Sequence, residues 1–457
     1  MKFKVISRSE RDNTRDRRDD IVKVHRNADP LLHPFERARE YTRALNASKL
    51  SKVFAKPFIG ALEGHMDGVS CMAKNPRSLV ALVSGACDGE VRVWDIAFKK
   101  CIWTAVAHRG WVRGISVSND GGVFYTCGDD KTVKSWRLAA DLEDRNEDED
   151  GDEGPRDSAV APLNTFSCGF ALQGIDCHWK SNLFASCGEK VNVWDPVRVE
   201  PVHSFEWGAD SIKTVAWNPA ETNLLGSCGS DRGVCFFDIR QSTPLRKLVL
   251  NMKSNKIAWN PMEPLNFTVA NEDHNLYTFD MRNLQKALNI HKDHVGAVMD
   301  VSYSPTGKEF VSASYDRTIR LFKSQGNKSY QVYHTKRMQR VFCAEFTQDA
   351  AYVLSGSDDT NIRIWKSDAS KPLGRLLNRE RVKMNYNEKL VQRYKHVQEI
   401  GRINRHQNAP KSIKKEKAKK QVISEAKRRK TDRRLKNDPN AEKPIPERTR
   451  AIIKEFE

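Results

Sequence analysis

Short segments of alternating apolar and polar residues run through the middle of the chain, separated by clusters of Gly, Asp, Asn and Ser. Clear examples are "EVRVWDI" (90–96) and "NIRIWK" (361–366), which begin with alternating polar and apolar residues and then reach an aromatic. An alternation of period two predicts β-strands with one buried face, and the polar clusters predict tight turns between them. The central part of the chain is therefore expected to be all-β.

The strand that ends in an aromatic residue recurs at a regular interval. Trp or Phe closes it at positions 94, 136, 194, 237, 279, 322 and 365, so five of the six intervals are 42 or 43 residues and one is 58. This period and ending resemble WD40 repeats, each of which supplies four short strands to a propeller blade. The seven copies predict a seven-bladed WD40 β-propeller over residues 52–368.

The segment "KVFAKPFIGALEG" (52–64) reads as a strand that has no earlier blade of its own. An unpaired strand at the edge of a sheet is an aggregation risk, which closed β architectures avoid by pairing their ends. We expect this segment to supply the outer strand of the last blade and so to close the ring.

A second pattern recurs inside the repeats. An Asp lies six residues before most of the closing aromatics, a Ser or Thr lies on the preceding strand, and a His lies 22 to 25 residues upstream of the Asp in several copies. The candidate groups are His65, Ser84, Asp88 and Trp94; His108, Thr126, Asp130 and Trp136; His294, Ser312 and Asp316; and His334, Ser355, Asp359 and Trp365.

These groups contain the residue types of a Ser-His-Asp catalytic triad, but a triad would not be expected to recur four times at one period. We interpret each group as a buried hydrogen-bond relay that satisfies its own polar atoms and holds neighbouring strands together. Where Phe replaces Trp the indole donor is missing, and the third to fifth blades also lack the histidine. Those blades are expected to depend more on packing.

No motif points to an enzyme or to a cofactor. The chain contains no phosphate-binding glycine loop, nucleophile elbow or Cys-x-x-Cys pair, and its ten cysteines are scattered singly. The segment "HKDH" (291–294) resembles a metal-binding pair, but the repeat already assigns His294, which leaves His291 alone. We therefore expect no catalysis, no metal and no cofactor, and reduced thiols as in a cytosolic or nuclear protein.

Charge is distributed very unevenly along the chain. The segment 141–157 holds ten acidic and two basic residues, so it predicts a disordered loop between the second and third blades, either a solvated spacer or a decoy for basic partners. Residues 371–457 hold 27 Lys and Arg against 11 Asp and Glu, and this net +16 is nearly all of the chain's net +18. There is no apolar leader at the start and no run long enough to span a bilayer, so we expect no membrane association.

The segment 411–436 predicts a basic helix with 13 basic and three acidic side chains. Like charges at this density repel one another unless a polyanion neutralises them, which favours nucleic-acid contact. A nuclear-import signal in "AKRRK" (426–430) is the alternative. The candidate RNA-binding residues are Lys411, Lys414, Lys415, Lys417, Lys419, Lys420, Lys427, Arg428, Arg429, Lys430, Arg433, Arg434 and Lys436.

Two further segments flank the propeller. Residues 376–405 carry apolar side chains at helical spacing, including Tyr386, Leu390 and Tyr394, so one face of this helix is expected to dock on the propeller. In the N-terminal arm, residues 1–51, the stretch "PFERAREYTRALNASKL" has helix-forming composition and packs on the ring or on a partner. With the propeller and a helical domain over 369–457, the chain divides into three parts.

These flanks carry a more specific resemblance than the repeats do. The segments "DPLLHPFERAREYTRALNASKLSKVFAKPFIGALEGHMDGVSCMAK" (29–74), "WNPMEPLNFTVANEDHNLYTFDMR" (259–282) and "INRHQNAPKSI" (403–413) are similar to those of the Sof-one-like WD-repeat family. The resemblance implies a nucleolar assembly factor of the small-subunit processome. Members associate with U3 small nucleolar RNA and pre-ribosomal RNA and are needed for maturation of 18S ribosomal RNA and of the 40S subunit.

The same resemblance implies an alternative function, because animal members resemble substrate receptors of cullin-RING ubiquitin ligases. Such receptors use a W-D-x-R ending on their blades, and this chain has "FDIR" (237–240) and "FDMR" (279–282) on successive repeats. A guanidinium at the end of a blade can bind an acidic group on a ligase adaptor. Arg240 and Arg282 are therefore candidate adaptor-binding residues, unless they pair with Asp carboxylates within the ring.

Overall fold

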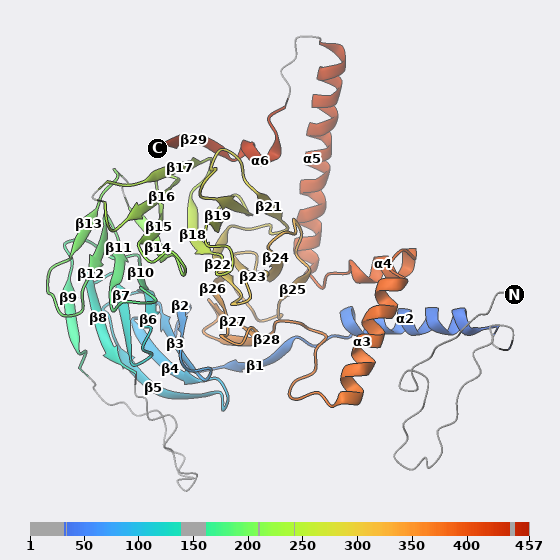
Figure 1. Ribbon diagram of the computed structural model, residues 1–457, viewed down its shortest axis with the longest axis horizontal. Helices are drawn as coiled ribbons and strands as arrows, with labels where there is room; N and C mark the ends of the chain where they lie inside the picture. The colour runs from blue at the N-terminus through green and yellow to red at the C-terminus, as the bar shows by residue number, and fades with distance from the viewer. Residues whose placement is uncertain are drawn as a thin grey trace, which may run out of the picture. The chain divides into compact units, whose positions relative to one another are not determined.

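A computed structural model of the protein describes residues 32, 34–138, 161–208, 211–241, 243–438 and 444–456. The chain forms two compact units, one made of residues 56–371 and 407–457 and the other of residues 1–55 and 372–406. In the larger unit, seven antiparallel sheets surround a common axis (Figure 1). The predicted seven-bladed propeller is therefore confirmed. No helix in the described part of the chain is long and apolar enough to cross a bilayer.

We number the blades in chain order, and the strands of each blade follow one another from the axis outward. Blades 1 to 3 are β2 (Val69–Lys74), β3 (Ala81–Ala86), β4 (Glu90–Asp95) and β5 (Lys100–Val106); β6 (Val112–Val117), β7 (Val123–Gly128), β8 (Thr132–Arg137) and β9 (Asn164–Ser167); and β10 (Gly174–Cys177), β11 (Phe184–Cys187), β12 (Val191–Trp194) and β13 (His203–Phe205).

Blades 4 to 6 are β14 (Ile212–Trp217), β15 (Leu224–Gly229), β16 (Gly233–Asp238) and β17 (Arg246–Leu250); β18 (Ser254–Trp259), β19 (Asn266–Asn271), β20 (Asn275–Asp280) and β21 (Asn289–Lys292); and β22 (Val298–Tyr303), β23 (Glu309–Ser314), β24 (Ile319–Lys323) and β25 (Gln331–Tyr333). Blade 7 consists of β26 (Val341–Phe346), β27 (Tyr352–Ser357), β28 (Ile362–Lys366) and β1 (Phe58–Leu62).

The strand β1 closes the ring, as predicted from the segment 52–64. It pairs antiparallel with β28, with Phe58 opposite Trp365 and Leu62 opposite Ile362. The two ends of the propeller thus share one sheet, and the outer edge of blade 7 is occupied by the start of the propeller chain.

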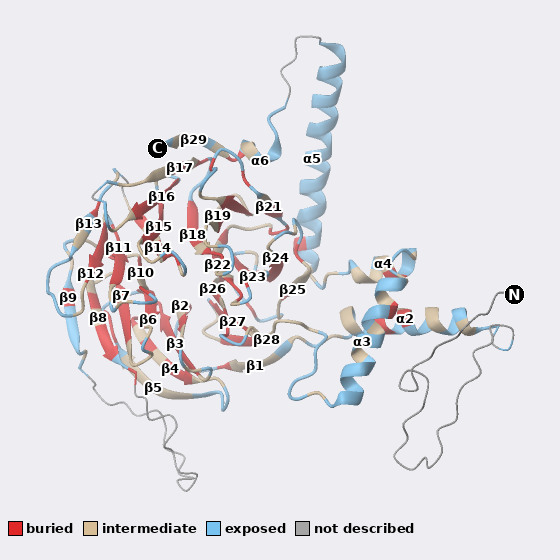
Figure 2. Cartoon of the chain, in the orientation of Figure 1, coloured by how far each residue is buried: buried red, intermediate tan, exposed pale blue. Residues whose placement is uncertain are grey.

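The hydrophobic core lies in layers between neighbouring sheets. Between blades 1 and 2, for example, Val83 and Val91 pack with Ile115 and Phe124. The second strands are sandwiched between blades and are buried along nearly their whole length, and completely so in β3 and β15 (Figure 2). This explains why Ser, Gly and Cys recur there, since small side chains fit between closely packed sheets.

A shared turn joins the second and third strands of most blades. In six blades the residue after the repeat Asp has a positive φ, as in Gly89, Lys131 and Arg317. In blade 2 the Asp130 carboxylate accepts a hydrogen bond from the backbone N–H of Thr132 at 3.2 Å, which fixes this turn. The Asp is therefore required by the local backbone before any relay is formed.

The acidic segment 141–157 lies outside the described residues. Its flanking strands, β8 and β9, are neighbours in the same sheet. The expectation that it separates the second and third blades is therefore corrected: it connects the third and fourth strands of blade 2. The interval from Trp136 to Trp194 is long because this connection is long, and the strand after it still completes blade 2.

The C-terminal segment of the larger unit contributes α5 (Lys411–Asn437), α6 (Glu447–Arg450) and β29 (Ile452–Phe456). The basic helix predicted over 411–436 is thus present as α5. The strand β29 was not predicted from the sequence: it pairs antiparallel with β17, with Val249 opposite Lys454, and makes blade 4 five-stranded.

The smaller unit consists of α2 (Glu36–Lys52), α3 (Asn378–Arg393) and α4 (Gln398–Asn404). Ala44 of α2, Leu390 of α3 and Ile400 of α4 form its buried core, and Tyr41, Leu45 and Tyr394 pack against them. The apolar face of residues 376–405 was expected to dock on the propeller. The surface that it packs on is instead α2, so the two segments that flank the propeller in sequence cover each other.

Candidate nucleic-acid interface and blade relays

The relay of blade 2 is complete. Trp136 Nε1–H donates to Thr126 Oγ1 at 3.0 Å, and Thr126 Oγ1 lies 2.8 Å from His108 Nε2. His108 Nδ1 lies 2.9 Å from Asp130, whose carboxylate also accepts from the Thr132 hydroxyl at 2.8 Å. Burial lowers the pKa of His108 more than Asp130 raises it. The imidazole is therefore neutral, with one ring nitrogen donating a hydrogen bond and the other accepting one. Because Thr126 is fully buried and bonded on both sides, the relay holds the blade together and offers no free nucleophile.

Blade 6 contains the shorter relay expected where Phe replaces Trp. His294 Nε2 lies 2.7 Å from Ser312 Oγ, and His294 Nδ1 lies 2.9 Å from Asp316. Burial lowers the pKa of His294. The Thr318 hydroxyl donates to Asp316 as Thr132 does to Asp130, so the two carboxylates are held in the same way.

In blade 1 the prediction placed the wrong carboxylate in the relay. Trp94 Nε1–H donates to Ser84 Oγ at 2.7 Å, and Ser84 Oγ lies 2.6 Å from His65 Nε2, as predicted. His65 Nδ1, however, faces Glu90 at 3.5 Å. Asp88 accepts only the backbone N–H of Glu90 at 2.9 Å and so serves the turn. A Glu two residues after the Asp takes the position of Thr132 or Thr318, and its carboxylate lies beside the histidine without a hydrogen bond to Nδ1.

In blade 7 the predicted histidine does not join the relay. Trp365 Nε1–H donates to Ser355 Oγ at 2.9 Å as expected. His334 instead interacts with the backbone of Asn408, and burial lowers its pKa. The Asp359 carboxylate is held by the Arg363 guanidinium, which also donates to Ser357 at 3.0 Å. An arginine on the third strand has replaced the histidine of the loop.

Blade 5 contains a different buried network, which the sequence analysis missed. His291 Nε2 lies 2.9 Å from Thr278 Oγ1, Thr278 lies 2.8 Å from Thr268, and Thr268 lies 2.6 Å from the Tyr303 hydroxyl of blade 6. On the other side of the ring, His291 Nδ1 lies 2.6 Å from the Gly326 carbonyl oxygen. Burial lowers the pKa of His291 to about 4. The "HKDH" segment was the sequence signal that could have drawn attention to His291. Both of its histidines take part in buried hydrogen bonds of the fold, and no group of metal ligands occurs among the described residues.

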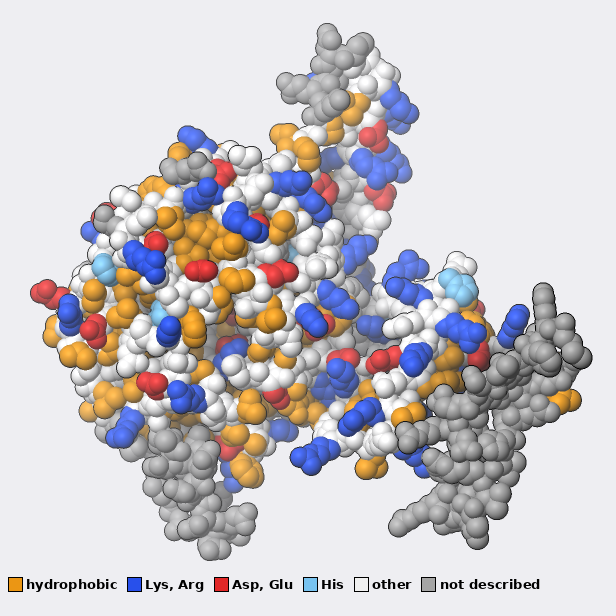
Figure 3. Space-filling model, viewed as in Figure 1, with side chains coloured by type: hydrophobic (Ala, Val, Ile, Leu, Met, Phe, Trp, Pro, Cys, Tyr) orange, Lys and Arg blue, Asp and Glu red, His pale blue; other side chains and the backbone are white. Residues whose placement is uncertain are grey.

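All 13 candidate RNA-binding side chains lie on α5 and are exposed. Figure 3 shows Lys and Arg side chains along this helix with a few acidic ones among them. Two of the candidates also contact the propeller. Lys417 forms an ion pair with Asp293, and Lys420 donates to the Val295 carbonyl at 2.9 Å. Together with the buried Ile413, they attach the first half of α5 to blade 6.

The adaptor-binding candidates Arg240 and Arg282 lie just after the third strands of the neighbouring blades 4 and 5, and both are exposed. Arg282 Nη2 donates to Asp280 at 2.9 Å, so the pairing with an Asp of the ring, left open above, is realised. Arg240 lies against the Asn223 amide, whose oxygen can accept from Nη2 at 2.6 Å.

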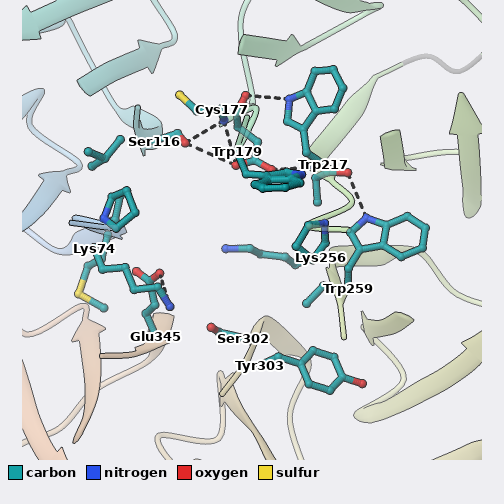
Figure 4. A pocket seen from close by; sticks show the side chains of 18 of the residues that line it. Lys74, Ser116, Cys177, Trp179, Trp217, Lys256, Trp259, Ser302, Tyr303 and Glu345 are labelled. Atoms are coloured by element: carbon teal, nitrogen blue, oxygen red, sulfur yellow. Dashed lines mark hydrogen bonds and ion pairs between the residues drawn. The ribbon is translucent and has the colours of Figure 1, made fainter. Parts of the chain in front are cut away.

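A cavity of about 600 Å³ lies on the axis of the ring and is lined by the first strands (Figure 4). Lys256 Nζ lies 2.9 Å from Asp300 of the next blade, and Lys74 Nζ lies 3.6 Å from Glu345. Asp176 accepts from the Trp217 backbone N–H at 2.8 Å, and burial raises its pKa to about 6. The charges of the channel thus link neighbouring blades to one another.

The propeller, its buried relays and its basic helical extension define a WD40-repeat scaffold. A model of the "WD domain, G-beta repeat" matches residues 56–95, 99–137, 199–238, 285–323 and 328–366, and a model of the "Sof1-like domain" matches residues 367–452. The repeats that end at Trp194 and Phe279 lie outside the matched segments. They belong to blades 3 and 5, in which the relay pattern is altered.

Curated relatives match over nearly the whole chain. The chain is 49% identical over 447 residues to "DDB1- and CUL4-associated factor 13" of Xenopus laevis, covering 98% of this chain and 97% of the relative. It is 49% identical over 446 residues to the human protein of that name, with 97% of each chain covered. "Protein SOF1" of Saccharomyces cerevisiae is 43% identical over 452 residues, covering 96% and 92%. The chain therefore belongs to the Sof1-like family of WD-repeat proteins.

Proposed function

We propose that the protein is a non-catalytic assembly factor of the small-subunit processome, located in the nucleolus. It is needed for U3-dependent processing of pre-ribosomal RNA and hence for 18S rRNA maturation and 40S subunit assembly. Membership of the Sof1-like family supports this function, and so do the relays of blades 2 and 6, whose Ser, Thr and His side chains are buried in structural hydrogen bonds. Other processome proteins would bind the loops of the ring.

The observation that carries the proposal is the exposed basic surface of α5. Its first turns are attached to blade 6, while the cluster Lys427, Arg428, Arg429 and Lys430 lies beyond the attached part and is exposed. Such a surface binds U3 and pre-ribosomal RNA through phosphates, with little dependence on sequence. If roughly six to ten phosphates are neutralised, affinity should fall about 10³- to 10⁵-fold between 50 and 200 mM salt.

Crosslinking of the protein to RNA in cells, followed by sequencing, tests this function. Reads should concentrate on U3 and pre-ribosomal RNA, with crosslinked peptides from 411–437. A variant with Gln at Lys427, Arg428, Arg429 and Lys430 should lose most of these reads. A matched control carries Gln at four exposed propeller lysines, Lys100, Lys180, Lys286 and Lys336. Both variants carry an added nuclear-import signal, so that loss of import through 426–430 cannot cause the result. Reads at background level would contradict the proposal.

A second candidate function is a substrate receptor of a cullin-RING ubiquitin ligase, which the name of the animal relatives favours. Arg240 and Arg282 occupy equivalent positions on neighbouring blades and are both exposed, so one adaptor surface could contact both. Purified DDB1 should bind the full chain, and the double variant Arg240→Ala/Arg282→Ala should lose that binding. Lack of association at low salt would exclude this function.

A further inference from the structure

The exposed surface of the smaller unit carries more basic than acidic side chains, although Glu380, Glu388 and Glu399 are exposed as well. Glu40 accepts from the Tyr394 hydroxyl at 2.9 Å and from Arg393 at 3.3 Å. Glu399 accepts from the Tyr41 hydroxyl. These acidic side chains are therefore engaged where the three helices meet. The basic side chains of α2 and α3 lie mainly on the exposed faces, which leaves the surface of this unit positively charged.

One contact brings basic residues of the two helices together. Arg43 Nη1 of α2 lies 3.4 Å from the Tyr386 hydroxyl of α3. On α2, Arg39 lies one turn before Arg43, and on α3, Lys383 and Lys389 lie three residues before and after Tyr386, so all four basic residues neighbour this contact. All four are exposed, and the Tyr386 side chain is 44% exposed. We call these five residues the Tyr386 patch.

The patch combines the two features that bind single strands. One exposed cation, Arg43, contacts the hydroxyl of a partly exposed aromatic ring, and three more lie within one helical turn of that contact, so phosphates can be neutralised while an unpaired base stacks on the ring. Stacking needs an accessible face of a base, which a closed duplex does not present along its length. The next tyrosine along the chain, Tyr394, directly after α3, is half-buried among the helices and serves packing. Of these two tyrosines, Tyr386 is therefore the one whose ring is exposed enough to stack on a base.

We propose that the Tyr386 patch binds a single-stranded polynucleotide, independently of the phosphate contacts of α5. This inference deepens the proposed function, since it assumes an RNA partner and adds a second site with a preference for unpaired segments. An acidic protein segment could also meet four cations, but it would gain little from the ring. The aromatic contribution therefore separates the two kinds of partner.

The test measures binding of a fluorescent single-stranded RNA of about 12 nucleotides and of the matching duplex to the full chain. Tyr386→Ala should weaken single-strand binding about 5- to 100-fold and leave duplex binding unchanged. Tyr386→Phe is the matched control: it keeps the ring, loses the hydroxyl, and should bind like the original protein. Lys383→Gln/Lys389→Gln, at exposed positions, should weaken binding and reduce its dependence on salt.

Three results would overturn the proposal. Single-strand binding that is unchanged by both Tyr386→Ala and Lys383→Gln/Lys389→Gln would exclude the site. An equal loss in Tyr386→Ala and Tyr386→Phe would exclude stacking. An oligoglutamate peptide that binds as tightly as RNA and is weakened as much by Tyr386→Ala would assign the patch to an acidic protein. Repeating the titrations with Gln at Lys427, Arg428, Arg429 and Lys430 separates this site from α5, so either can fail alone.

Discussion

Lys417 of α5 forms an ion pair with Asp293, whose side chain is buried in the loop between β21 and β22. Asp293 also accepts hydrogen bonds from the backbone N–H and the hydroxyl of Ser329, both at 2.7 Å. Burial alone would raise the pKa of Asp293, but Lys417 and Ser329 outweigh it and the pKa is lowered. Lys417 therefore neutralises the buried Asp293 carboxylate of the propeller. The same ion pair fixes the position of α5, the helix that carries the candidate RNA-binding residues.

Replacing Lys417 by Ala should destabilise the attachment of α5. The change leaves the Asp293 carboxylate buried without its cation, but Lys417 is half-exposed, so we expect a cost of about 1–2 kcal/mol, below that of a fully buried pair. Hydrogen exchange of residues 411–424 should become faster. Lys415→Ala, at an exposed position two residues away, is the control and should leave exchange unchanged; equal effects of the two variants would contradict the anchoring role.

Removing the hydroxyl at the centre of the blade 2 relay should be costly. Thr126→Val keeps the shape but leaves His108 Nε2 and Trp136 Nε1–H buried without partners, at about 1–3 kcal/mol for each. We expect a loss of about 2–6 kcal/mol in the free energy of unfolding. Urea denaturation measures it, with Thr165→Val on the exposed strand β9 as the control. A loss no larger than that of the control would mean that the relay does not stabilise the blade.

Stability should fall as the pH drops from about 7 to 5, because two buried histidines remain neutral in the folded state. Burial lowers the pKa of both His65 and His291 to about 4. The unfolded chain, with a histidine pKa near 6.5, then binds more protons, so the stabilisation is complete above about pH 6.5 and is lost towards pH 4. Each histidine should contribute roughly 2 kcal/mol of the loss between pH 7 and 5.

Urea titrations at the two pH values measure this loss. His291→Gln should be less stable than the original protein at pH 7 but should show a smaller decrease between the two pH values, since one of the titrating groups is gone. An unchanged pH dependence in that variant would show that His291 does not titrate in this range.

The added strand β29 should be held by one face only. Ile452 packs against the core of blades 4 and 5, whereas Ile453 is 53% exposed. Ile452→Ala should cost about 1–2 kcal/mol and speed hydrogen exchange in β17, because the edge of blade 4 loses its partner more often. Ile453→Ala should stay within about 0.5 kcal/mol. Equal protection of β17 in the two variants would contradict this account.

The parts of the fold that depend on local pattern could be predicted from the sequence. The repeat placed all seven blades and the closing strand, because six of the blades use the same turn, marked by an Asp and a following residue with positive φ, and the closing aromatic places the seventh. The relay of blade 2 could be predicted completely. The different carboxylate of blade 1 could have been predicted by comparing the residue two positions after the Asp. This residue is Thr132 in blade 2 and Thr318 in blade 6, but Glu90 in blade 1.

The parts that depend on which distant surfaces meet could not be predicted. The apolar stripe around Leu390 shows that one helix face is buried, but a stripe does not specify whether α2 or the propeller covers it. The strand β29 is a short segment outside the repeat, and only its pairing with β17 defines it. Likewise, the spacing of Lys417 on α5 cannot indicate that Asp293, 124 residues away, lies beside it.

The pairing of β1 with β28 also brings together the two distant segments of the chain that form the smaller unit. Helix α2 ends at Lys52, six positions before β1 begins, and α3 begins at Asn378, twelve positions after β28 ends at Lys366. Pairing of the two strands holds these distant segments on short tethers, which raises their effective concentration towards the millimolar range. On the ribosome, α2 must wait through the synthesis of all seven blades before Leu390 and Ile400 can cover Ala44. A completed helical unit is therefore a sign that the whole propeller has been made.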